Sequence, residues 1–140
     1  MRKGYKFEQQ IQKVLDYVNS IGGHAHKNHP ERTVDGTYIK GEVFDYEVFL
    51  PHYKACFDAK EVETDTWRMQ QKDIIQAENL KHCKNAGISA YFLIYFKSKG
   101  VLQIDVDKVI EILKKGKKSI SWTLGENWSL LEVLGGNQRC

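Results

Sequence analysis

The run from Ile88 to Phe96 is the feature that most constrains the fold of this chain. Apolar side chains fill nearly every position of the run, whose length is typical of a strand. Because neighbouring side chains in a strand point to opposite faces of the sheet, such a run is typical of a strand that is buried on both faces. This pattern favours a sheet with cover on both sides, as in an α/β domain.

Periodicity predicts the other elements. Helices are expected at residues 5–21, Trp67–Ala86 and Val106–Lys115, each followed by glycine. Strands are expected at His24–Pro30, Glu42–Leu50, Tyr53–Val62, Ile88–Phe96 and Val101–Asp105, with a turn or flexible loop at 31–41 and a strand followed by irregular structure in Ser119–Leu134. This order predicts one α/β domain over residues 1–140, built around a mixed sheet.

Two acidic residues lie in adjacent strand-like runs. If Pro51-His52 forms a two-residue hairpin loop, Asp45 is placed directly opposite Asp58. Directly opposed side chains have Cβ atoms roughly 4.5–5.5 Å apart, so both carboxylates can reach one divalent cation. Strand alternation also turns Lys60 to the face that Asp58 occupies. The spacing is therefore compatible with a metal-dependent active site.

Ordinary surface charges on a solvated strand would give the same short motif by chance. Two further residues favour a site. Gln76 is a polar amide on an otherwise apolar helical stripe, so it needs a buried partner, either a backbone carbonyl or an active-site group. Glu8 borders the buried stripe of the first helix, where it serves either the site or the helix dipole.

Charge is unevenly distributed along the chain. Residues 1–66 carry nine Lys or Arg and 11 Asp or Glu, whereas residues 67–140 carry 12 and seven. A basic half beside an acidic patch is compatible with a polyanionic partner and a metal site. The three cysteines are widely spaced and no apolar run has the length of a membrane span, so we expect a cytoplasmic protein.

Short motifs follow one another along the chain. They are Gly4–Ile11 (G-x-x-F-E-x-x-I), Asp45-Tyr46, Phe57–Glu61 (F-D-A-K-E), Gln76, Gly87-Ile88 and Gly116–Ile120 (G-x-K-S-I). Together, and in this order, they resemble the RecU family of Holliday-junction resolvases. That family is similar to archaeal junction resolvases and to other nucleases of the PD-(D/E)XK, restriction-endonuclease-like type.

The resemblance implies a restriction-endonuclease-like fold and a metal-dependent endonuclease that cuts branched DNA in a bacterial or phage-infected cell. It implies that Asp45, Asp58 and the backbone carbonyl of Ala59 hold Mg²⁺, for which Mn²⁺ can substitute. Lys60 is then expected to orient the attacking water. Paired cuts in strands related by twofold symmetry imply a homodimer.

Two supporting roles follow from the same resemblance. Glu8 is expected to reach the metal through a water, and Gln76 to position Lys60 or the phosphate. The basic residues expected to contact DNA are Lys27, Lys117 and Lys118.

Two departures from the family pattern leave alternatives open. Asp58 stands where the family usually has Glu, and the segment between Pro30 and Asp45 is shorter than the corresponding family segment, which forms a stalk. The alternatives are a PD-(D/E)XK nuclease that acts on forks or duplex DNA, a non-catalytic DNA-binding module of the same fold, and an unrelated protein with a chance motif.

Overall fold

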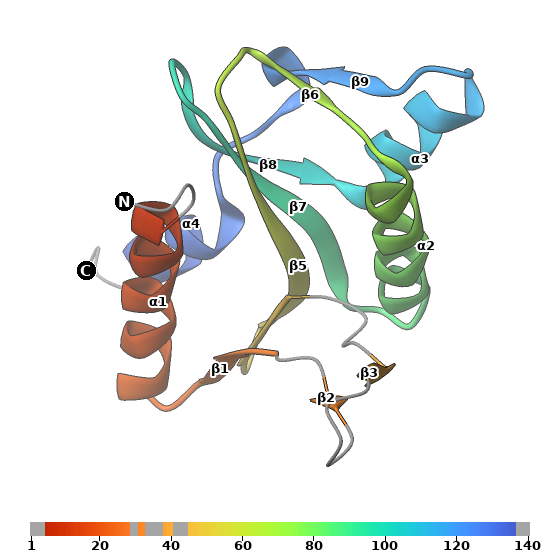
Figure 1. Ribbon diagram of the computed structural model, residues 1–140. Coiled ribbons are helices and arrows are strands. Elements are labelled where there is room, and N and C mark those ends of the chain that lie inside the picture. Colours follow the sequence, from red (N-terminus) through yellow and green to blue (C-terminus); the bar gives the residue numbers. More distant parts are fainter. Residues whose placement is uncertain (1–4, 29–30, 33–37, 41–44, 137–140) are drawn as a thin grey trace.

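A five-stranded mixed sheet forms the centre of the computed structural model, which describes residues 5–28, 31–32, 38–40 and 45–136 (Figure 1). Its strands, in spatial order, are β1 (His24–Lys27), β4 (Tyr46–Leu50), β5 (Tyr53–Val62), β7 (Ser89–Phe96) and β8 (Gly100–Asp105). Strands β5 and β7 run parallel, and the other neighbouring pairs run antiparallel. The mixed sheet expected from the order of elements is confirmed.

Helices cover both faces of this sheet (Figure 1). One face packs against α1 (Tyr5–Ser20), and the other against α2 (Gln71–Asn85) and α3 (Val106–Lys114). Along β7, Tyr91 and Leu93 join the core beside α1, whereas Phe92 and Ile94 join the core beside α2. The central run is therefore buried on both faces, as its composition predicts. None of the helices in the described part of the chain has the length and hydropathy needed to cross a membrane.

The hairpin of β4 and β5 has the register that a two-residue loop at Pro51-His52 predicts. Leu50 pairs with Tyr53, and the ladder continues without a shift to the pair of Tyr46 and Phe57. One further step in the same register brings Asp45 opposite Asp58. The loop geometry thus sets the two acids side by side.

The predicted long helix Trp67–Ala86 is wrong at its beginning. Residues Thr66–Arg68 form strand β6, which pairs with β9 (Ser119–Ser121), and α2 begins at Gln71. Trp67 is buried, with its ring centroid 4.8 Å from that of Phe92. Burial of this aromatic ring, together with pairing to a strand that is distant in the sequence, outweighs the absence of a helix-breaking residue.

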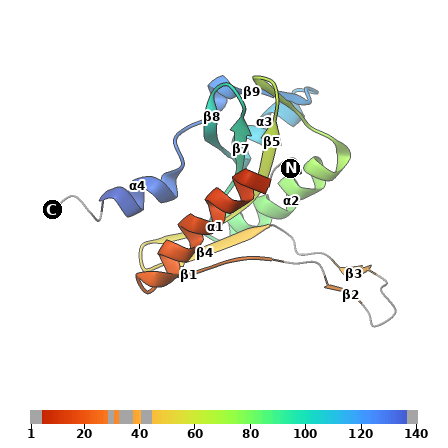
Figure 2. The same cartoon turned by 60° about the vertical axis from the view of Figure 1, so that its left-hand side comes forward.

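The loop predicted at residues 31–41 also contains strands. Strand β2 (Glu31–Arg32) pairs antiparallel with β3 (Tyr38–Lys40), and the pair projects from the body of the molecule (Figure 2). The turn suggested by Asp35-Gly36 lies outside the described residues. The stretch predicted as a turn or flexible loop therefore contains a pair of short antiparallel strands.

The C-terminal tail was expected to be irregular after its strand, but it contains the short 3₁₀ turn Trp122–Leu124 and helix α4 (Ser129–Gly136). Trp128 Nε1 donates a hydrogen bond to the hydroxyl of buried Tyr91 over 2.8 Å. Burial of Trp128 and Leu130 anchors this segment on the sheet. The tail folds because its aromatic and aliphatic residues find a core surface that the tail sequence alone does not reveal.

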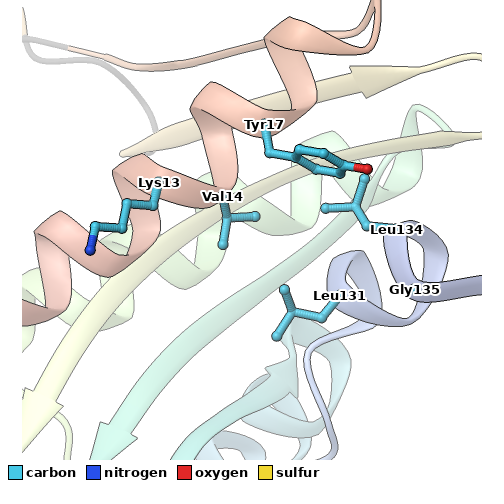
Figure 3. Close-up of a pocket in the computed structure, with 6 residues that line it drawn as sticks. All are labelled: Lys13, Val14, Tyr17, Leu131, Leu134 and Gly135. Carbon is cyan, nitrogen blue, oxygen red and sulfur yellow. The ribbon is translucent and has the colours of Figure 1, made fainter. Parts of the chain in front are cut away.

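Helix α4 leaves an apolar groove of about 340 Å³ beside α1. Figure 3 shows the residues that line it, which are Lys13, Val14, Tyr17, Leu131, Leu134 and Gly135. None of the acids of the hairpin lines this groove.

Candidate active site

The two predicted acids meet at the point where β4 and β5 separate. Asp58 lies within β5 on the face toward α2 and is fully buried, whereas Asp45 directly precedes β4 and is half-buried. The backbone N–H of Asp45 donates to Asp58 Oδ1 over 2.6 Å. In return, Asp45 Oδ2 accepts the backbone N–H of Ala59 over 3.3 Å. Each carboxylate is thus fixed by the backbone next to the other.

The electrostatics of this pair are unfavourable without a counter-charge. Burial, followed by the negative charge of Asp45, raises the pKa of the Asp58 carboxyl to about 8. Asp58 Oδ2 is buried and has no hydrogen-bond partner. A buried polar atom without a partner calls for an explanation, and a bound cation is one that also neutralises the two acids.

The donor atoms at this point fit a hard divalent cation. Two carboxylates converge, and Asp58 Oδ2 has no hydrogen-bond partner. Oxygen ligands suit Mg²⁺, Mn²⁺ or Ca²⁺ better than zinc. No cluster of three or more His, Cys, Asp or Glu side chains occurs among the residues that the structure describes. The remaining ligands would therefore be backbone carbonyls and water, as is usual for Mg²⁺.

Lys60 lies two residues after Asp58 on the same face of β5 and reaches α2. Its Nζ donates to Gln76 Oε1 over 2.7 Å and lies 2.8 Å from Asp73 Oδ1. Gln76 was predicted to lie on the apolar face of its helix and to need a buried partner. That partner is the Lys60 side chain rather than a backbone carbonyl. The structure brings Asp45, Asp58, Lys60 and Gln76 together at one place.

Asp73 is the site residue that the sequence reasoning missed. It is buried on α2 with Ala77 and Leu80, which follow it by four and seven residues. This spacing was readable from the sequence, because those offsets mark one helical face. Of the polar residues on this helical face, only Gln76 was predicted from the sequence as a site residue, although Asp73 precedes it by three residues.

Glu8 and Lys27 form a separate group toward α1. Their charged atoms lie 3.7 Å apart, and Lys27 Nζ lies 5.9 Å from the ring centroid of Tyr46. Burial and the charges of Glu8 and Asp45 raise the pKa of the Tyr46 phenol. Tyr46 therefore feels the charges of both Glu8 and Asp45, although no direct contact joins Glu8 to either acid among the described residues.

Comparison with known proteins identifies the family of this chain. Residues 9–133 match the family described as RecU, Recombination protein U. The chain belongs to the RecU family. The prediction from its short motifs is confirmed, and membership of this resolvase family implies an endonuclease. A search of curated proteins found no match.

A solved structure shares the fold of this RecU-family chain. It is a 1.6 Å structure of Hjc from Archaeoglobus fulgidus, a Holliday junction resolvase from an archaeal hyperthermophile. The match covers 96% of this chain and 97% of that chain, with 18% sequence identity and a TM-score of 0.59. The expected restriction-endonuclease-like fold, a mixed sheet between helices, is thereby confirmed.

Lys117 and Lys118 have no contact with the acid pair among the described residues of this RecU-family chain. Both are exposed in the turn between α3 and β9, and the backbone carbonyl of Lys118 accepts the N–H of Met69 over 2.7 Å. Neither side chain forms an ion pair with another described residue. Their position on an open turn leaves both ammonium groups free to meet a phosphate.

Proposed function

We propose that this RecU-family chain is a metal-dependent, structure-specific endonuclease that resolves Holliday junctions by paired phosphodiester cleavage. One observation carries the proposal: buried Asp58 contacts Asp45, keeps one oxygen without a hydrogen-bond partner, and precedes the anchored Lys60 by two residues. Family membership and the shared fold with Hjc support the substrate class. A non-catalytic module would have no need to bury opposed acids.

Asp45 and Asp58 would hold the cation, which we propose is Mg²⁺, with Mn²⁺ as a substitute. When bound, it would neutralise charge on the scissile phosphate and lower the pKa of a ligated water. The backbone carbonyl of Ala59 is the proposed third protein ligand. In a strand the N–H and C=O of one residue share an edge, and the Ala59 N–H faces Asp45.

Lys60 would supply positive charge beside the reacting phosphate and orient the attacking water. A lysine ammonium has three N–H donors, and Gln76 accepts one of them. Asp73 lies 2.8 Å from the same nitrogen, and the N–H groups that neither residue engages would point toward the acid pair and the substrate. Gln76 would therefore act by aiming Lys60.

Glu8 is proposed to act at longer range. Burial raises the pKa of Tyr46, and the charges of Glu8 and Asp45 raise it further, so the two carboxylates share one electrostatic environment. A water between Glu8 and the metal would link them. Lys27, which is paired with Glu8, would then exchange this partner for a DNA phosphate.

Junction resolution requires two cuts in symmetry-related strands, and the chain offers one acid pair. We therefore propose a homodimer in which each chain is a single nuclease domain. The exposed Ile75 of α2 and Leu131 of α4 mark two surfaces that could form its interface. The dimer would act on branched DNA in the cytoplasm of a bacterial or phage-infected cell.

A second candidate is cleavage of forks or duplex DNA by the same site. It is favoured by the short β2–β3 hairpin, whose strands have two and three residues. A small projection offers little surface for the centre of a four-way junction. The chemistry would be unchanged, and the preferred substrate would differ.

The test is a cleavage assay with a synthetic four-way junction, a fork and a linear duplex of matched sequence, with and without Mg²⁺. We expect Mg²⁺-dependent paired cuts in the junction and little cleavage of the duplex. Light scattering should report about twice the 16.2 kDa chain mass. Preferred cleavage of the fork or duplex supports the second candidate, and no cleavage of any substrate contradicts both.

A further inference from the structure

Asp73 is the second buried charged residue in the described part of the chain, besides Asp58. Its side chain is 4% exposed, and that of Lys60 is 17% exposed. A buried carboxylate loses hydration and requires hydrogen bonds or an opposite charge in compensation. The partners of Asp73 therefore indicate why α2 carries an acid on its inward face.

The two oxygens of Asp73 have different partners. Oδ2 accepts the backbone N–H of Gln70 over 2.8 Å, which caps the first turn of α2. Oδ1 lies 2.8 Å from Lys60 Nζ as an ion pair, outside the geometry of a hydrogen bond. The first contact fixes the carboxylate to the backbone, so the second holds Lys60 against a rigid support.

We infer that Asp73 is a positioning residue for the cleavage reaction, which clamps the Lys60 ammonium beside the acid pair through charge. The inference rests on the proposed function. A free lysine explores many rotamers, and fixing one is costly in entropy. Gln76 supplies a directed hydrogen bond, whereas Asp73 supplies the opposite charge. Together they leave Lys60 with N–H groups that face the substrate.

The variant Asp73→Asn separates charge from shape, because asparagine keeps the size of the side chain and an oxygen that can accept the Gln70 N–H. We expect kcat to fall by about 10- to 100-fold, the usual effect of losing a partner that orients a functional group. KM and junction affinity in Ca²⁺ should not change. In a Lys60→Ala background, Asp73→Asn should have no further effect, because its target is absent.

Two variants distinguish positioning from a structural role. Asp107→Asn is the matched control, because Asp107 also lies in a first helical turn and contacts Lys81 and Lys84 within 2.7 Å. It should leave kcat unchanged. Adding Gln76→Glu to Asp73→Asn returns a carboxylate to Lys60, so it should restore part of kcat, which a capping defect would not allow.

Unchanged kcat in Asp73→Asn, or an equal loss in the Lys60→Ala background, would overturn the inference and leave the proposed nuclease intact. An independent readout is the proton–nitrogen NMR signal of the Lys60 ammonium, assigned through its loss in Lys60→Ala. A clamped ammonium should give a visible signal in the wild-type protein and lose it in Asp73→Asn. If the wild type cleaves no DNA, the proposed function fails, and this signal still decides whether the clamp exists.

Discussion

Asp58 and Asp73 are both buried, and each has an oxygen without a hydrogen bond, but their neighbours carry opposite charges. Asp58 faces a second acid, Asp45, whereas Asp73 faces Lys60 at 2.8 Å. The charge on Asp73 is compensated within the chain. The charge on Asp58 is compensated only in part, by the Asp45 N–H and by Lys60, so burial and the charge of Asp45 still raise its pKa.

This difference separates two uses of a buried acid. An acid beside a lysine stabilises a fixed arrangement, and removing it disturbs its partner. An acid beside another acid destabilises the metal-free protein, because the two negative charges repel each other. A bound cation removes this repulsion, so the pair favours cation binding. Variants of the two aspartates should therefore differ in their effects on catalysis, metal binding and stability.

The largest expected effect comes from the acid pair. Asp45→Asn or Asp58→Asn should lower junction cleavage by more than about 1,000-fold, the upper end of the cost of losing one charge-stabilising group. Binding in Ca²⁺ should persist, because the carboxylates do not form the DNA surface. A gel assay over a range of Mg²⁺ concentrations measures this, with Asp107→Asn as the control. Retained cleavage by both acid variants would exclude the assigned site.

Lys60→Ala should have the second-largest effect, with a loss of about 100- to 1,000-fold in kcat and a small change in affinity for the junction. The reason is that Lys60 acts on the reacting phosphate rather than on the duplex as a whole. Single-turnover kinetics with a fluorescent junction separate the two quantities. Lys84→Ala is the control, because Lys84 pairs with Asp105 and Asp107 away from the acids. A loss of affinity that equals the loss of rate would place Lys60 in DNA binding instead.

The metal-free protein should lose stability as pH rises from about 4 to about 8. The folded-state pKa of Asp58 is raised to about 8, above the unfolded value of about 4, so folding binds a proton in this range. The contribution of the protonated group is complete below about pH 4 and is lost as pH approaches 8. Thermal unfolding in EDTA should therefore show a falling Tm.

In Asp58→Asn the Tm should fall less as pH rises, and the Tm at pH 8 should be higher than in the wild type, because the amide carries no proton to lose. Saturating Mg²⁺ should raise the Tm of the wild type at pH 8 and leave that variant unchanged. An identical pH profile for the variant and the wild type would show that Asp58 does not titrate in this range.

The smallest effect concerns the exposed turn. Changing Lys117 and Lys118 together to Ala should weaken junction binding, with a salt slope reduced by about one for each lost phosphate contact. Cleavage at saturating enzyme should stay the same, because the turn lies apart from the acids. Fluorescence anisotropy over a salt series measures the slope. An unchanged slope removes these lysines from the DNA surface.

The acid pair was predictable because local rules determine it. A two-residue loop sets the register, and alternation places Asp58 and Lys60 on one face. The inward position of Asp73 was also readable from its helical spacing, but its contact with Lys60 depends on how α2 packs on the sheet. The beginning of α2 depends in turn on the burial of Trp67 against Phe92. Such a tertiary contact leaves no periodic trace in the sequence. Helix α4 was missed for the same reason, because Trp128 finds its partner in distant Tyr91.

The most direct test of the contrast between the two buried aspartates is Mn²⁺ binding, measured by isothermal titration calorimetry without DNA. The account predicts that the wild type and Asp73→Asn bind Mn²⁺ with the same affinity, and that Asp58→Asn shows no binding heat. Binding by Asp58→Asn as tight as that of the wild type would contradict it, because the cation would then be held elsewhere.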